Sequence, residues 1–234
     1  MRAVARTKPL VPEAAWPVLA TLRSFAGDGP IVGTPSFRKV LALAAHPDDE
    51  SVGCGGLLAL LADAGAEVHV CFATDGEATI GAALPVDEVA RRRRAEAVAA
   101  CRILGTRPPT FLGHPDGCLA ERAEALAADI GRLVDDLEPE VVIAPWELDG
   151  HPDHRAVFAA VPAGVECWGY ETWTPLTPNR IVDVSTVFAR KEEALASYET
   201  AHLAFDVGAM LALNRYRSVH GLMGRGHAEA YLVR

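Results

Sequence analysis

The sequence predicts an α/β fold built around a largely parallel sheet, in one domain of ordinary size. From Val40 onward, short apolar runs alternate with longer segments of helical periodicity, a pattern typical of βαβ units. The chain has 234 residues, of which 50% are hydrophobic, which is enough for one core but leaves no second full domain. Because repeats and low-complexity tracts are absent, the sequence excludes a disordered or collagen-like protein.

The first 36 residues are predicted to form an N-terminal arm. They are rich in proline and glycine, and they predict one short helix over residues 16–25, with Pro17 near its start. Residues 37–234 form the predicted main domain.

Strands and helices are predicted to alternate along this domain. Apolar runs predict strands at residues 40–45, 67–73, 110–113, 141–145 and 168–173. Apolar residues at three- and four-residue spacing predict helices at residues 55–64, 86–104 and 119–137, from Asp153 onward, at 185–198 and at 201–215. Four consecutive arginines, residues 91–94, point in four directions on a helix, so they predict a solvated face rather than a phosphate site.

The charge balance narrows the classes of partner. Lys and Arg number 22 against 31 Asp and Glu, a net charge of −9, whereas proteins that hold nucleic acid or anionic membranes need basic surface. No apolar run approaches the roughly 20 residues of a membrane span, and no signal-peptide pattern follows Met1, so a cytoplasmic protein is expected. The five cysteines are odd in number and widely spaced, which disfavours disulfides and a zinc-thiolate site.

A His-Pro-Asp tripeptide occurs three times, each time at or shortly after the end of a predicted strand. The copies begin at His46, His114 and His151. Ligands bind outside the carboxyl ends of the strands in open α/β sheets, so loops leaving different strands can converge on one crevice. Each proline fixes its own φ and favours an extended conformation for the preceding histidine. We therefore expect polar loops held by their backbone at one edge of the sheet.

Two copies carry a further potential metal ligand at the fourth position, Asp49 after the first and His154 after the third. A catalytic zinc ion takes three protein ligands and keeps one position for water, which two histidines and one carboxylate match. Imidazole also suits Fe²⁺ or Co²⁺, whereas Mg²⁺ and Ca²⁺ prefer oxygen. A single tripeptide would more simply be a turn whose aspartate caps a helix, but this density of charged groups is too costly for a purely stabilising role. The cluster therefore predicts a catalytic metal site, with zinc as the leading candidate.

Two segments carry a family resemblance. They read Ala-His-Pro-Asp-Asp-Glu over residues 45–50, followed by Gly-Cys-Gly-Gly over residues 53–56, and Pro-Trp-Glu-Leu-Asp-Gly-His-Pro-Asp-His over residues 145–154. These segments resemble the two signature motifs of the LmbE-like, PIG-L superfamily of zinc-dependent N-deacetylases. Weaker similarity continues through Arg93 and Asp116 to the end of the chain, so that the resemblance covers roughly residues 38–234.

The resemblance implies a Rossmann-like three-layer α/β/α fold and the hydrolysis of an N-acetyl group, usually on a glucosamine-type sugar, by a metal-activated water. Carried over by position, it implies that His46, Asp49 and His154 bind zinc and that Asp48 is the general base. Adjacent carboxylates diverge, so one can bind the metal while the other takes a proton from water. His151, when protonated, would stabilise the oxyanion or give a proton to the departing amine.

Four acidic residues complete the predicted site. Asp153 is expected either to set the tautomer of one of the histidines or to cap the helix that begins there. Asp116 and Glu77 follow predicted strands and are expected to hydrogen-bond sugar hydroxyls. Asp149 is expected to do the same or to hold its loop. Residues 74–79 lack the arginine that some family members use against substrate, and residues 198–201 depart from a common Ser-Gln pair, so the particular substrate stays open.

Three other functions remain open at this point. One is an amidase that cleaves a larger acyl or cysteine-conjugate amide. A second is a nucleotide-binding module with Gly53, Gly55 and Gly56 as a phosphate loop, although these glycines come late after the strand and do not follow G-x-G-x-x-G. A third is a metal-binding scaffold without catalysis, which would not need Asp48. The preferred prediction is a zinc deacetylase of a small N-acylated amino sugar, with no nucleic-acid or membrane partner and with homo-oligomerisation left open.

Overall fold

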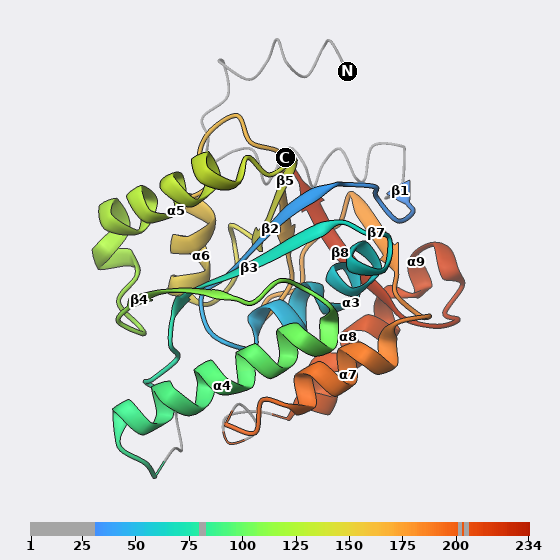
Figure 1. Ribbon diagram of the computed structural model, residues 1–234. Helices are drawn as coiled ribbons and strands as arrows, with labels where there is room; N and C mark the ends of the chain where they lie inside the picture. Colours follow the sequence, from blue (N-terminus) through green and yellow to red (C-terminus); the bar gives the residue numbers. More distant parts are fainter. Residues whose placement is uncertain (1–30, 80–82, 201–202, 204–205) are drawn as a thin grey trace.

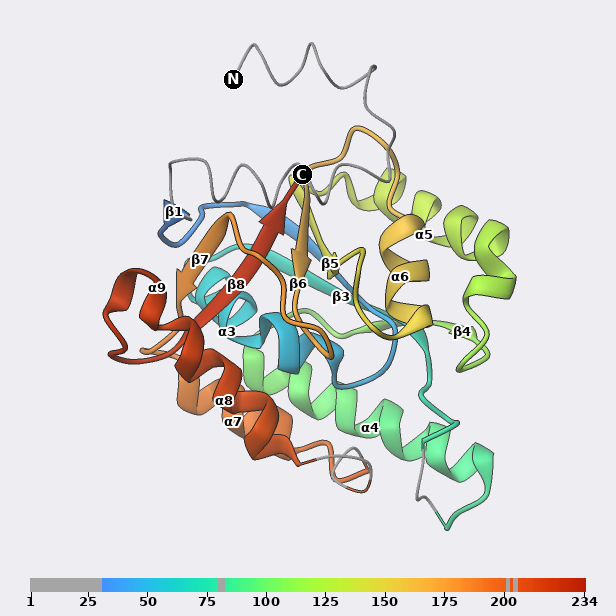
Figure 2. The same cartoon turned by 180° about the vertical axis from the view of Figure 1, so that it is seen from behind.

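The computed structural model describes residues 31–79, 83–200, 203 and 206–234. Within these residues the chain forms three layers, with helices on both faces of a central sheet (Figures 1 and 2). The α/β prediction is therefore confirmed. The short helix predicted over residues 16–25 lies outside the described residues.

The sheet contains eight strands within the described part of the chain. In spatial order they are β1 (Ile31–Val32), β7 (Arg180–Asp183), β8 (Ala228–Val233), β6 (Cys167–Tyr170), β5 (Val141–Pro145), β2 (Lys39–Ala44), β3 (Glu67–Thr74) and β4 (Thr110–His114). Of the paired strands, only β8 runs antiparallel to its neighbours, β6 and β7. The mostly parallel sheet predicted from the alternating pattern is thus observed.

Alternate residues of β2 contribute to two hydrophobic cores, one on each face of the sheet. Val40 and Ala42 pack with one set of buried residues and Leu41 and Leu43 with another, because successive side chains of a strand point to opposite faces. Buried on both faces, β2 is almost continuously apolar, as parallel strands are.

The helices divide between the two faces. The first face is covered by α3 (Asp49–Asp63), α4 (Val86–Leu104) and α7 (Phe188–Ala196), which contact one another. The opposite face is covered by the short 3₁₀ helix η3 (Ala120–Arg122), α5 (Ala123–Leu137) and α6 (Pro152–Ala159). Two C-terminal helices, α8 (Val207–Arg217) and α9 (Val219–Leu222), precede β8.

Helix α3 begins at Asp49, whereas the sequence predicted a start at residue 55. Gly53 and Gly56 made this start hard to predict, and in the structure they allow close contacts with neighbouring elements. A Cβ on Gly53 would lie 1.9 Å from Cδ2 of the Tyr170 ring, and a Cβ on Gly56 would lie 2.6 Å from Cβ of Val184. They therefore mark tight packing of α3 on the sheet rather than a loop.

Several strand and helix boundaries towards the C-terminus also differ from the prediction. β6 ends at Tyr170, three residues before the predicted end, and β8 was not predicted as a strand. The helix predicted over residues 201–215 is observed as α8, and the helix predicted over 119–137 begins with the 3₁₀ turn. From the predicted N-terminal arm, the described strand β1 pairs with β7 in the sheet.

The strand order identifies where a ligand should bind. From β2 the chain continues through β3 to β4 on one side, and then returns to β5 on the other side of β2. The crevice at such a switch point lies outside the carboxyl ends of the two flanking strands. Here those strands are β2 and β5, whose following loops carry His46 and His151. Among the described helices, none is long and apolar enough to cross a bilayer.

Candidate metal and catalytic site

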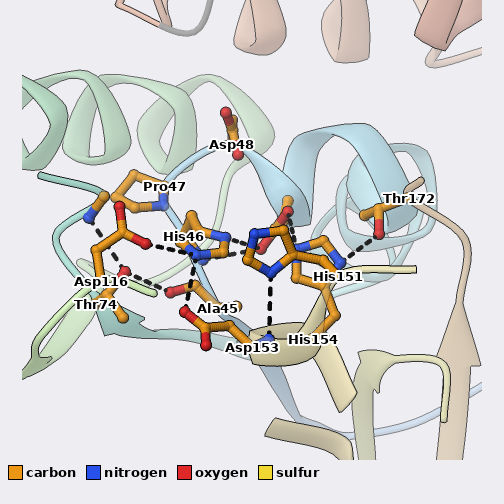
Figure 3. Close-up of polar contacts among 12 residues, drawn as sticks. Ala45, His46, Pro47, Asp48, Thr74, Asp116, His151, Asp153, His154 and Thr172 are labelled. Atoms are coloured by element: carbon orange, nitrogen blue, oxygen red, sulfur yellow. Dashed lines mark hydrogen bonds and ion pairs between the residues drawn. The ribbon is translucent and has the colours of Figure 1, made fainter. Parts of the chain in front are cut away.

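Two of the three His-Pro-Asp segments meet directly at this crevice, and the third contributes its aspartate (Figure 3). The first leads from β2 into α3, and the last leads from the β5 loop into α6. Nε2 of His114 instead lies 2.9 Å from Asp129 on α5, outside the cluster, but Asp116 reaches His46. The predicted convergence is therefore observed for His46, Asp116 and His151.

The three predicted metal ligands lie together. Oδ1 of Asp49 is 3.1 Å from Nε2 of His154, and its Oδ2 is 3.5 Å from Nδ1 of His46. The Asp49 carboxylate also accepts a hydrogen bond from the His46 backbone amide, at 2.8 Å. The aspartate and His154 are nearly inaccessible to solvent. The Asp49 carboxylate thus lies between two imidazoles, that of His46 from the segment after β2 and that of His154 from the segment after β5.

His154 is held from behind by two residues. Its Nδ1 lies 2.9 Å from Oδ1 of Asp149 and 2.8 Å from the hydroxyl of Thr172. This arrangement points Nε2 toward Asp49. Burial disfavours the charged ring, but Asp49 and Asp149 outweigh it and raise the pKa of His154 to about 9. Sequence reasoning missed Thr172, because it comes just after the end of β6 with no motif around it.

The buried Asp149 carboxylate forms several contacts with other groups of the protein. It is 1% exposed, and its Oδ2 accepts from the Thr172 hydroxyl and from the backbone amides of Trp173 and Thr174. Its Oδ1 faces His154 and accepts from the backbone amide of His151. Of the two roles considered for Asp149, these contacts favour holding the loop and the imidazole.

Nε2 of His46 faces two carboxylates. Asp116 Oδ1 is 3.0 Å away and Asp153 Oδ2 is 3.4 Å away. Asp153 does not cap α6; its carboxylate accepts from the backbone amides of Gly117 and Leu119, which ties the Asp116 loop to the crevice. Although burial opposes the charged ring, these carboxylates and Asp49 raise the pKa of His46.

His151 lies between the other two imidazoles. Its ring centroid is 4.8 Å from that of His46 and 4.8 Å from that of His154. His151 caps α6, because its Nδ1 accepts from the backbone amide of Asp153 at 3.2 Å. The neutral ring therefore carries its proton on Nε2. Burial and the nearby positive charge of His46 lower the pKa of His151.

Asp48 sits at the start of α3 in a strained backbone conformation. Its φ is 130°, a region that costs a non-glycine residue about 1–3 kcal/mol. The guanidinium of Arg93 lies 3.1 Å from Asp48 Oδ2 and also donates to the Pro47 carbonyl. Burial raises the pKa of Asp48 to about 6, against the opposing effect of Arg93. Strain of this kind is typical of functional positions.

The arginine run does not form a uniformly solvated face. Arg91 and Arg92 are exposed and pair with Glu88, as the solvated interpretation predicts. Arg93 is 4% exposed and pairs with Asp48, so that interpretation is wrong for this one residue. A helix places each of four consecutive residues in a different direction, and one of these directions meets the site.

Glu77 and Asp116 belong to two loops that hold each other. The Glu77 carboxylate accepts from the backbone amide of Asp116, and the Asp116 carboxylate accepts from the backbone amide of Ala78, at 2.9 and 3.0 Å. Asp116 also faces His46, so the bonds between these two loops help to hold Asp116 at the histidine cluster. Their predicted contacts with sugar hydroxyls stay predictions.

The residues present fit a bound divalent metal ion. Within the described residues, His46, His151 and His154 bring ligand atoms within 4.8 Å of one another, and so do His46, Asp116 and Asp153. The predicted ligand Asp49 is in neither group, but its two carboxylate oxygens lie 3.1 Å from His154 and 3.5 Å from His46. Nε2 of His154 is buried and has no hydrogen-bond partner among the described residues, although it faces a carboxylate. Mixed imidazole and carboxylate donors suit zinc and its first-row neighbours.

Comparisons with known proteins identify a family and named relatives. Residues 41–165 match the PIG-L family, described as GlcNAc-PI de-N-acetylase. The 1D-myo-inositol 2-acetamido-2-deoxy-alpha-D-glucopyranoside deacetylase of Mycobacterium sp. (strain JLS) is 32% identical over 205 residues, covering 73% of this chain and 65% of that protein. Diacetylchitobiose deacetylase of Thermococcus kodakarensis is 29% identical over 187 residues, covering 70% of each.

A solved structure shows the same fold. The N,N'-diacetylchitobiose deacetylase from Pyrococcus horikoshii matches with a TM-score of 0.70 and 24% identity, covering 85% of this chain and 84% of that one. The fold and the histidine-aspartate crevice define a Rossmann-like α/β protein with a candidate metal site. Since the family match spans more than half of the chain, the protein belongs to the PIG-L, or LmbE-like, family. The chain spans less than two thirds of the length of the inositol glycoside deacetylases that it matches, 43% and 65% in two of them.

Proposed function

We propose that this protein is a zinc-dependent N-deacetylase that hydrolyses the acetamido group of a small amino sugar or glycoside. The observation that carries the proposal is the meeting of His46, Asp49 and His154 beside Asp48 and His151. Relatives named as deacetylases of acetylated amino sugars support the reaction and the class of substrate. Fe²⁺ or Co²⁺ would suit the same donors.

Each side chain has a role in the proposed reaction. His46, Asp49 and His154 would hold the ion, which when bound supplies the Lewis acidity that acidifies water and polarises the amide carbonyl. Asp48 accepts a proton from the attacking water, whose oxygen forms the new bond to the acetyl carbon. The C–N bond then breaks as the proton held by Asp48 passes to the departing nitrogen, and Nε2–H of His151 donates a hydrogen bond that stabilises the oxyanion. The products are acetate and the free amino sugar.

The remaining acidic residues are proposed to prepare the site. Asp153 and Asp116 hold His46 in orientation, and Asp149 with Thr172 holds His154. Fixing the second ring nitrogen in this way selects the tautomer that presents the other nitrogen to a metal. Asp116 and Glu77 also remain proposed contacts for sugar hydroxyls. A cytoplasmic location stays a proposal, and the five free cysteines are what a reducing compartment would leave.

The direct test is acetate release from a panel of N-acetylated glucosaminides and aminoglycosides. We expect turnover by the purified protein, loss of turnover after a chelator removes the metal, and recovery when zinc is added back. Full activity in the chelated protein would contradict the metal-dependent reaction.

The alternative amidase is tested with the same protein. Substrates that differ only in acyl length, N-acetyl against long-chain acyl or cysteine-conjugate amides, are compared by kcat/KM. We expect the acetyl substrate to be preferred. A strong preference for the larger acyl group would replace the deacetylase proposal with this alternative.

A further inference from the structure

A buried ion pair lies beneath α3, outside the metal and catalytic cluster. It joins Lys191 of α7 to Glu229 of β8, with Nζ and Oε1 2.6 Å apart. Lys191 is 0% exposed and Glu229 is 1% exposed. Burying two charges in this way costs several kcal/mol per ion before their attraction is counted, so the pair is weak grounds for a purely stabilising role.

Both members of the pair bond to the backbone of α3. The Glu229 carboxylate accepts from the amides of Gly56 and Leu57, each at 2.8 Å, while Lys191 donates to the Val52 carbonyl at 2.8 Å. In a regular α-helix the Gly56 amide donates to the Val52 carbonyl. The ion pair therefore hydrogen-bonds to both the Gly56 amide and the Val52 carbonyl, within two helical turns of Asp49.

The sequence of α3 makes room for this engagement. A Cβ on Gly56 would lie 3.0 Å from Oε1 of Glu229, and a Cβ on Gly55 would lie 3.4 Å from Cγ of Lys191. The hydroxyl of Tyr231 donates to the second carboxylate oxygen at 2.7 Å. With four donors, the Glu229 carboxylate is fully satisfied, so its position is fixed.

We propose that the Lys191–Glu229 pair is a positioning element that sets where the first turns of α3 lie relative to β2 and β5. This inference rests on the proposed function, because Asp48 and Asp49 stand at the start of that helix. The partners of Asp49 are His46, on the loop that leaves β2, and His154, in the first turn of α6 after β5. Pinning the helix backbone to β8 and α7 prevents a shift along its axis, and a displacement of about 1 Å is enough to reduce catalysis strongly.

The test is the double variant Lys191→Met/Glu229→Gln, which removes both charges and leaves neither unpaired. We expect the zinc dissociation constant, measured by competition with a chromogenic chelator, to rise roughly ten-fold or more. The kcat for acetate release should fall with little change in KM. Slower turnover alone would not distinguish positioning from partial unfolding, so metal affinity of the folded protein is the deciding measurement.

A matched control joins the same two helices. Arg190 of α7 pairs with Asp63 at the end of α3, through contacts of 2.9 and 2.7 Å, and both side chains are partly or largely exposed. The variant Arg190→Met/Asp63→Asn should leave zinc affinity and kcat unchanged. An equal loss in this control would show that any α3–α7 contact matters, and would contradict a specific role for the buried pair.

A second variant covers the case in which the double variant does not fold. Glu229→Asp keeps the charge pair and withdraws the carboxylate from the helix amides, so it should also weaken zinc binding. Wild-type zinc affinity in either folded variant overturns the positioning role, and failure of both variants to fold assigns the pair to stability alone. If the wild-type protein releases no acetate, the proposed function is refuted, whatever the zinc affinities of the variants.

Discussion

At the scale of single residues, three carboxylates in one crevice acquire different roles from their surroundings. Asp49 faces the nitrogens of two imidazoles, Asp48 is turned toward Arg93, and Asp149 lies behind His154 with all its contacts inside the protein. We therefore propose different roles for three chemically identical side chains: Asp49 as a metal ligand, Asp48 as the base and Asp149 as a support for His154. The separation comes from backbone position, and it can be tested one residue at a time.

Replacing the proposed base should separate catalysis from metal binding. Asp48→Asn removes the proton acceptor while keeping the shape of the side chain and its tolerance of a positive φ. We expect kcat to fall by about 10²–10⁴ with one zinc per chain retained, as measured by acetate release and metal analysis. In Asp49→Asn the zinc itself should be lost. Full deacetylation by Asp48→Asn would refute the assignment of the base.

Replacing the support of His154 should weaken the metal site without touching a ligand. Asp149→Asn exchanges one acceptor oxygen for an NH₂ group among donors, so the imidazole loses its fixed orientation. Zinc affinity should fall roughly 10- to 100-fold. The matched control is Asp129→Asn, which alters a similar carboxylate on His114, away from the cluster. Equal affinities in the two variants would count against the orienting role.

At the scale of elements, α3 determines how closely the carboxylates approach the sheet. Its glycines permit contacts with Tyr170 and Val184 that any larger residue would prevent. The same glycines made the helix hard to predict, because glycine lowers helix propensity in the absence of tertiary contacts. Contacts from outside the helix compensate for this low helix propensity. They are the close packing on the sheet and the hydrogen bonds to Lys191 and Glu229.

A single methyl group on α3 should be poorly tolerated. Gly53→Ala places a Cβ 1.9 Å from Cδ2 of Tyr170, so the free energy of unfolding should drop by about 1–3 kcal/mol. Gly131→Ala is the control, because a Cβ there meets nothing within 4 Å in the middle of α5, and it should add about 0.5–1 kcal/mol. Urea unfolding of both variants measures the two effects. A Gly53→Ala protein as stable as wild type would contradict the packing described for α3.

At the scale of the whole molecule, the strand order brings separate segments of sequence together. The sequence predicted the parallel sheet, most of its strands and the convergence of His46, Asp49 and His154, because the motifs follow strands whose ends share one edge. It did not predict β8, since Glu229 interrupts that apolar run and its partners Gly56 and Lys191 are distant in the chain. Arg93 and Thr172 were also assigned no part in the site, because local periodicity does not tell which polar residue turns inward.

The central claim is that one metal ion lies among His46, Asp49 and His154, with Asp48 beside it. Anomalous diffraction from zinc-loaded crystals, collected on both sides of the zinc edge, tests this directly. We predict a single strong peak about 2.0–2.3 Å from one atom of each of the three side chains. A peak at another group of residues, or a protein that takes up no zinc, would contradict the account.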